Sequence, residues 1–147
     1  MSVELTEDVY VEVLEKTFQQ AIANVGLERL AINFFDYFFD QFPETQQYFA
    51  GTDINLFAAK KLMIIFVFLK DVIQHPNYAE GQISQEVVRH QMYGLDDKQY
   101  YFTLIDALHQ VVRAAQSRCW NDITESSWQD IAYLFKGQIT SSINDYL

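Results

Sequence analysis

The sequence predicts an all-α protein with six to seven helices, and three features of the chain support this. Apolar residues recur at helical spacing in several long segments. Glycine and proline are scarce, with five and two residues, so little turn chemistry is available for a sheet of short strands. No segment has the pattern of a convincing strand. We expect one domain, residues 1–147, that buries roughly 70% of its unfolded surface.

The chain is strongly acidic, with a net charge of −10 and a pI of about 4.5. Such a surface repels phosphate backbones and anionic lipids, so binding to nucleic acids or to membrane surfaces is disfavoured. The longest apolar run, residues 62–69, is far shorter than the roughly 20 residues of a membrane span. Because no secretory signal is visible and Cys119 is the single cysteine, we expect a cytoplasmic protein with one packed thiol.

The first two helices are predicted over residues 6–24 and 27–42. Thr6 is a suitable N-cap, acidic residues follow it in the first turn, and Gly26 separates the two helices. Pro43 ends the second helix, because its ring removes a backbone donor and clashes with the preceding turn.

A tight turn over residues 43–49 leads to a third helix over residues 54–74. This helix is apolar on most faces, which predicts that it is buried between others. Pro76 ends it, since the residue before a proline resists the helical region. A short fourth helix over residues 84–92 is predicted to start with Ser84 as its cap.

Two long helices complete the chain. Asp96 and Asp97 open a helix that is predicted to run to about Arg118, and Thr124 opens the last one, which contains Trp128.

The segment RHQMYGLDDKQY, residues 89–100, carries the most informative pattern. A histidine near the end of a helix, followed by a sharp turn, is one way to hold haem iron. Together with FFDYFFDQFPETQQYF and KKLMIIF earlier in the chain, this order of segments resembles the globin family over nearly the whole sequence. It is most similar to single-domain bacterial haemoglobins and to the globin part of flavohaemoglobins. The matching positions are Phe34, Phe35, Pro43, Phe49, His90, Tyr100 and Trp128.

The resemblance implies a globin fold around haem b (iron protoporphyrin IX) that reversibly binds a diatomic gas, O2, CO or NO. His90 corresponds to the proximal iron ligand, whose second ring nitrogen is oriented by a hydrogen bond. Phe49 corresponds to the phenylalanine that packs on the porphyrin face. Leu95 and Tyr100 would line the proximal side, although Tyr100 could equally be a core tyrosine with a satisfied hydroxyl.

On the distal side the chain departs from its relatives. Aligning Lys61-Leu62 with the basic-apolar pair of the family places Ala58, or Ala59 in the neighbouring register, where a His or Gln usually faces the ligand. Phe35 stands where many bacterial members have tyrosine, and Leu62 completes an apolar wall. Without a hydrogen-bond donor, bound O2 would lose a contact worth about 1–3 kcal/mol, and the less polar CO would lose less.

Two charged residues near the expected pocket leave alternatives open. A desolvated Lys61 could lose its proton and act as a sixth iron ligand, or its ammonium group could reach a haem propionate or water. Glu86 lies one turn before His90, where relatives usually have leucine. Either the helix is rotated so that Ile83 and Val87 face the pocket, or Glu86 pairs with a partner such as Arg89, or the pocket holds another cargo.

Catalysis is not expected from this chain. No hydrolase triad, phosphate loop or zinc motif is present, His75 and His109 lack partner ligands, and Asp36 and Asp40 form a solvated stripe. The last helix offers Ile143 or Asn144 where flavohaemoglobins have a glutamate that tunes the proximal histidine, and the reductase domains of those relatives are not in this sequence. Turnover would therefore need a separate reductase.

The alternative hypothesis is a haem-free globin-fold sensor or interaction module, which Glu86 and Ala58 motivate. The aromatic excess also points weakly to a homodimer contact through the last two helices.

Overall fold

The computed structural model describes residues 7–95, 97–116 and 120–146. Over these residues the chain forms six α-helices and one 3₁₀ helix and contains no strand, which confirms the predicted all-α fold class. Thr6, Asp96 and Cys119 lie outside the described residues, so the expectations for them stay untested. The prediction that a helix runs to about Arg118 is wrong, because the helix ends at Ala114. The elements are α1 (Glu7–Val25), α2 (Leu27–Gln41), η1 (Pro43–Phe49), α3 (Ile54–Gln74), α4 (Pro76–Gln91), α5 (Lys98–Ala114) and α6 (Asp122–Tyr146).

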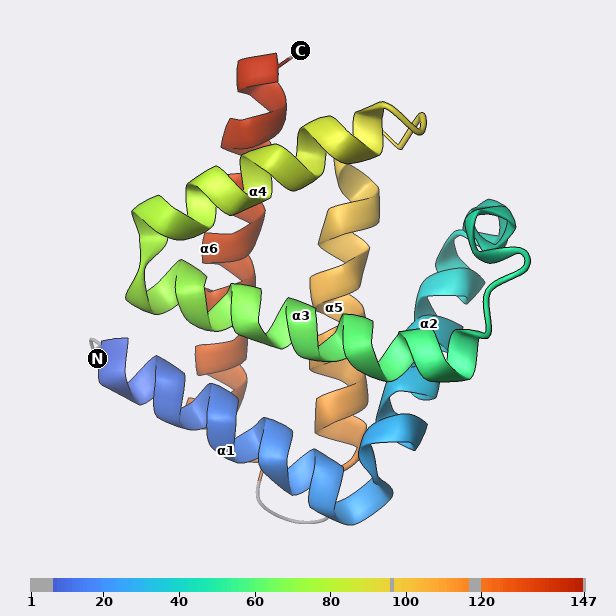
Figure 1. Ribbon diagram of the computed structural model, residues 1–147. Coiled ribbons are helices and arrows are strands. Elements are labelled where there is room, and N and C mark those ends of the chain that lie inside the picture. Colours follow the sequence, from blue (N-terminus) through green and yellow to red (C-terminus); the bar gives the residue numbers. More distant parts are fainter. Residues whose placement is uncertain (1–6, 96, 117–119, 147) are drawn as a thin grey trace.

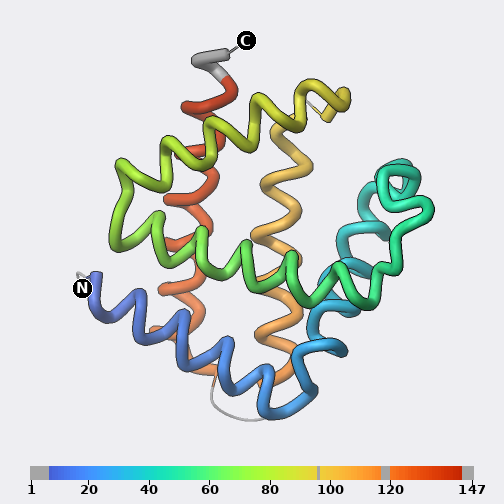
Figure 2. Tube along the Cα trace, in the orientation of Figure 1, coloured from blue at the N-terminus to red at the C-terminus, as the bar shows by residue number. Residues whose placement is uncertain are grey.

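The helices cross one another rather than forming a parallel bundle (Figure 1). α5 and α6 pack against each other, and α3 and α1 pass across them. α2 contacts both α3 and α5 at one side of the molecule, whereas α4 packs on α3 and α6 at the other. The Cα trace shows α4 folding back over α3 before a short loop leads into α5 (Figure 2). The space between α3, α4 and α5 is where the candidate site lies.

Polar side chains and glycine set several helix boundaries. Asp53 accepts a hydrogen bond from the backbone nitrogen of Asn55 at the start of α3, and Asp97 accepts one from that of Gln99 at the start of α5. Gly26, between α1 and α2, has a φ of 86°, a conformation that glycine adopts without strain.

Two predicted helix starts are wrong. α6 begins at Asp122 instead of Thr124, because the side chain of Asn121 caps it and accepts a hydrogen bond from the backbone nitrogen of Thr124 at 2.8 Å. α4 begins at Pro76 instead of Ser84. Pro76 occupies the first turn, where a backbone N–H has no helical partner in any case.

The inner face of α4 explains why the helix extends so far. Ala79, Ile83 and Val87 are all buried at a spacing of four residues. Gly81 lies on the exposed face, where packing does not require a side chain. His90, on the next turn after Val87, is thereby held over the core near the end of α4.

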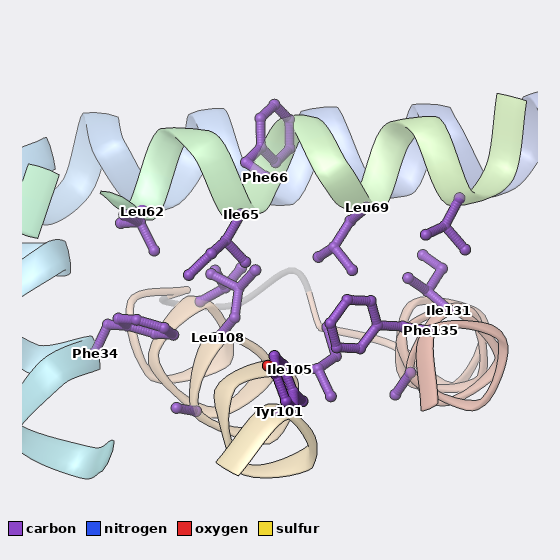
Figure 3. Packing of buried hydrophobic residues seen from close by; sticks show 14 of the residues in the cluster. Phe34, Leu62, Ile65, Phe66, Leu69, Tyr101, Ile105, Leu108, Ile131 and Phe135 are labelled. Atoms are coloured by element: carbon purple, nitrogen blue, oxygen red, sulfur yellow. The ribbon is translucent and has the colours of Figure 1, made fainter. Parts of the chain in front are cut away.

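The core is a continuous cluster of aliphatic and aromatic side chains. Leu62, Ile65 and Leu69 of α3 point toward α5 and α6, where Ile105, Leu108 and Phe135 meet them (Figure 3). On the opposite side of α3, Phe66 stacks on Phe18 of α1 with ring centroids 4.2 Å apart. The fully buried Trp128 donates a hydrogen bond from Nε1 to Oγ1 of Thr17 at 3.1 Å. These contacts fix α3 relative to α1, α5 and α6.

No helix among residues 7–95, 97–116 and 120–146 is both long and apolar enough to cross a membrane.

Candidate functional site

Two adjoining cavities lie beside His90. Their volumes are about 110 Å³ and about 60 Å³, and Lys61, His90, Tyr101 and Leu104 line both. Larger hollows on the outer face of α4 and beside α2 and α5 are more open to solvent, and no histidine lines them. The first cavity is also lined by Phe35, Phe38, Thr45, Tyr48, Phe49, Leu95 and Tyr100, and the second by Ile65, Phe68, Ile83, Glu86, Phe135 and Ile139.

His90 is a neutral, oriented imidazole. Its Nδ1 lies 2.7 Å from the backbone carbonyl oxygen of Glu86. Because a carbonyl can only accept, Nδ1 carries the proton and Nε2 keeps a free lone pair. Burial lowers the pKa of His90, more than the hydrogen bond to Glu86 raises it, so the neutral form is favoured. The ring of Tyr101 packs edge-on at a centroid distance of 5.8 Å. The site therefore presents a fixed nitrogen donor.

The carboxylate of Glu86 is compensated by an ion pair with Arg89. Ile83 and Val87 are buried at the same time. Two of the expected alternatives therefore hold together: the helix turns Ile83 and Val87 inward, and Glu86 pairs with Arg89. The helix turns its apolar residues inward, and Glu86 lies at the edge, where its side chain is 30% exposed. Its Oε2 is 3.9 Å from Nδ1 of His90, too far for a hydrogen bond. The backbone carbonyl, not the carboxylate, orients the imidazole.

An aromatic cluster closes the other side of the first cavity. Phe49 of η1 packs against Phe35 and Phe57, with ring centroids 5.7 Å and 5.3 Å apart. Near the cavity mouth, Tyr100 meets Phe42 edge-on at 4.7 Å, and its hydroxyl donates to Oε1 of Glu44 at 3.3 Å. These contacts link η1 to α5, so the short 3₁₀ segment forms part of the wall.

Most of the predicted site residues meet at this cavity. Phe35, Phe49, Lys61, Leu95 and Tyr100 line it together with His90. Ala58 and Leu62 are buried in the core but do not line either cavity, and Leu62 points toward α5 near Phe34 (Figure 3). Their expected contact with a cofactor stays a prediction, as does the register choice between Ala58 and Ala59.

Tyr101 is the main residue that the sequence reasoning missed. It lies among the apolar side chains of the core (Figure 3), and its buried hydroxyl has no hydrogen-bond partner in residues 7–95, 97–116 and 120–146. Burial raises its pKa to about 12, and the charge of Glu86 adds to the shift. The signal was present in the sequence, because Tyr101, Ile105 and Leu108 repeat at the helical spacing of an inward face.

Lys61 brings a second nitrogen to the site. Burial lowers its pKa, while the nearby charges of Glu86 and Arg89 act in opposite directions. With Lys61 and the Tyr101 hydroxyl in its lining, the cavity is more polar than Phe35, Ala58 and Leu62 alone predict.

Comparison with known proteins gave one match. The family model described as Globin matches residues 32–139, which include every residue that lines the two cavities. No curated protein and no solved structure matches the chain. The predicted likeness to bacterial haemoglobins in particular stays a prediction.

Proposed function

Since this chain belongs to the globin family, we propose that it binds haem b through His90 and takes a diatomic gas, O2, CO or NO, as its ligand. The observation that carries the proposal is the state of His90. A neutral imidazole, with Nδ1 engaged by the carbonyl of Glu86 and Nε2 free, lines two adjoining cavities. That is the form in which a histidine binds iron.

The side chains of the site suit a porphyrin. The lining of the first cavity is largely aromatic and aliphatic, which matches the apolar faces of the macrocycle. The buried hydroxyl of Tyr101 finds no hydrogen-bond partner in the part of the chain that the structure describes, as expected where a polar atom of a ligand completes the site. Cavities of about 110 and 60 Å³ are smaller than usual ligand sites of about 300–1,000 Å³, so side chains must move on uptake. We expect Lys61 and Tyr48 to move, because both have long side chains that border the first cavity.

The positions of the lining residues give each of them a role in holding the haem. When bound, haem would supply the iron that takes the gas. His90 supplies the protein ligand from α4, and its hydrogen bond to Glu86 holds the ring in one orientation. Phe35 and Phe49 exclude water from the cavity, which protects a reduced iron from oxidation. Leu95 and Tyr100 close the side next to the loop before α5.

Titration of the purified apoprotein with haemin tests the proposal. We expect stoichiometric uptake with a Soret band, and a shift of that band when CO is added to the reduced protein. His90→Ala should abolish the His-ligated spectrum. His75→Ala is the matched control, because His75 is exposed at the end of α3 and lines neither cavity. Unchanged spectra in His90→Ala would refute the assignment of the iron ligand.

A haem-free sensor or interaction module is the second candidate. The small volume of the cavities and the carboxylate of Glu86 beside His90 favour it. A colourless preparation that takes up no added haemin would support this candidate over the first.

A further inference from the structure

Lys61 and His90 are the two residues with side-chain nitrogen that line the cavities. Every other lining residue has an aliphatic or aromatic side chain or one that carries a hydroxyl or a carboxylate group. The two come from α3 and α4, which pack against each other, and both border both cavities. His75 and His109 line neither cavity, so neither competes as a second imidazole.

The amine of Lys61 has no acidic partner among the described residues. The ion pairs found there involve Lys70, Arg89, Arg113, Lys136 and two histidines, and Lys61 takes part in none. Glu86 borders the second cavity with Lys61 but is paired with Arg89. A half-buried ammonium without a counter-ion is unfavourable, and losing its proton relieves that cost.

Burial shifts the pKa of acidic and basic side chains in this site in opposite directions. It raises the pKa of the Tyr101 phenol, which therefore keeps its proton and remains a poor metal ligand. It lowers the pKa of Lys61, so the ammonium form is less favourable there than in water. Nε2 of His90 and the amine of Lys61 are thus the two nitrogen groups of the lining, one on each helix.

We infer that Lys61 is the second axial ligand of the haem iron in the ferric, gas-free protein, with His90 as the first. The inference rests on the proposed haem function. The ammonium group releases one proton to solvent, and the nitrogen lone pair fills the open position of the iron; no electron is transferred and no other bond breaks. An incoming gas must displace this amine.

The test compares ferric optical and electron paramagnetic resonance spectra of the haemin-loaded protein and three variants. Lys61→Ala removes the amine, whereas Lys61→Arg keeps a cation for a haem propionate but cannot lose its proton. Lys60→Ala is the matched control, since Lys60 is the exposed neighbour on the same turn. Far-UV circular dichroism verifies that each variant is folded.

We expect low-spin, six-coordinate iron in the wild type and in Lys60→Ala, and high-spin iron in Lys61→Ala and Lys61→Arg. If the amine occupies the iron about 90% of the time, Lys61→Ala binds added azide about tenfold more tightly. High-spin wild-type protein, or a low-spin spectrum that persists in Lys61→Arg, overturns the inference and leaves the haem proposal intact. A wild type that takes up no haemin overturns both.

Discussion

Replacing Tyr101 with phenylalanine tests whether the hydroxyl of Tyr101 stabilises the folded apoprotein or serves the site at a cost in stability. The substitution removes one oxygen and leaves the ring, so the edge-on contact with His90 at 5.8 Å is kept. The hydroxyl that disappears is buried and has no hydrogen-bond partner among the described residues. We therefore expect Tyr101→Phe to increase the stability of the apoprotein, which is the reverse of most core substitutions.

The size of the gain follows from the cost of an unsatisfied hydroxyl. Leaving a buried polar group unpaired costs about 1–3 kcal/mol. The second cavity, about 60 Å³, is large enough to hold a water molecule beside this hydroxyl, which reduces that cost. We therefore take the lower end, about 1 kcal/mol, which corresponds to a rise in Tm of about 2–4 °C for a chain of this length.

Thermal and urea unfolding of the apoprotein, followed by far-UV circular dichroism, measure this gain. Tyr133→Phe is the control, because Tyr133 is 79% exposed and its hydroxyl faces solvent; we expect no more than about 0.5 kcal/mol of change there. In haemin-loaded protein the gain should shrink if the hydroxyl of Tyr101 meets a polar group of the ligand. A fall in Tm of the apo-variant by a few degrees would show that the hydroxyl is already paired and refute the reasoning.

Three further substitutions test the scaffold. Burial alone would raise the pKa of Glu125, but hydrogen bonds from Trp120 and His109 hold it below its usual range. A lowered pKa stabilises the fold above the unfolded value of about 4.3 and is lost as pH falls through the folded value. Glu125→Gln should therefore cost about 1–2 kcal/mol in urea unfolding at pH 7, and the difference from wild type should shrink as pH falls below about 4.3 and vanish once it is below the lowered pKa of the folded state. Gly26→Ala meets no neighbour within 4 Å but places a side chain at a φ of 86°, so we expect a loss of about 1–2 kcal/mol, and a larger loss would point to a hidden clash. Trp128→Phe removes the hydrogen bond to Thr17 and leaves a cavity, which should cost about 2–4 kcal/mol in the same assay, and an unchanged midpoint would contradict the burial of the indole.

Helix boundaries could be predicted where one residue decides them locally. Gly26 and Pro43 separate elements because of their backbone chemistry, and Asp53 precedes α3 as a side-chain cap. The start of α4 could not be found in this way, because residues 76–83 carry only two buried side chains and a glycine. Tertiary packing of Ala79 and Ile83 against the core makes that stretch helical, and no local signal reports this packing.

For the candidate site, too, some positions could be predicted from the sequence and others could not. The family resemblance implied that Leu95 and Tyr100 lie on the same side of the pocket as His90, and all three line the first cavity. The orientation of α3 could not be read from its sequence, because apolar residues lie on most of its faces and leave its rotation undetermined. The structure shows this rotation: Lys61, expected near the pocket from the family resemblance, lines both cavities, whereas Ala58 and Leu62 line neither.

Three polar side chains of the site have nitrogen or oxygen atoms that are free to bind a ligand. Within the described part of the chain, His90 has a free lone pair on Nε2, Lys61 has a partly buried amine without a counter-ion, and Tyr101 has a hydroxyl without a hydrogen-bond partner. The hydroxyl of Tyr101 raises the free energy of the apoprotein, since a buried polar group without a partner is costly, and burial makes the charged form of Lys61 less favourable. A leucine at position 61 and a phenylalanine at position 101 would give a more stable apoprotein. A ligand that satisfies these groups recovers the loss on binding, and by linkage it stabilises the folded chain in proportion to its affinity. Haemin should therefore raise the Tm of the wild type by more than that of the Lys61→Leu, Tyr101→Phe double variant.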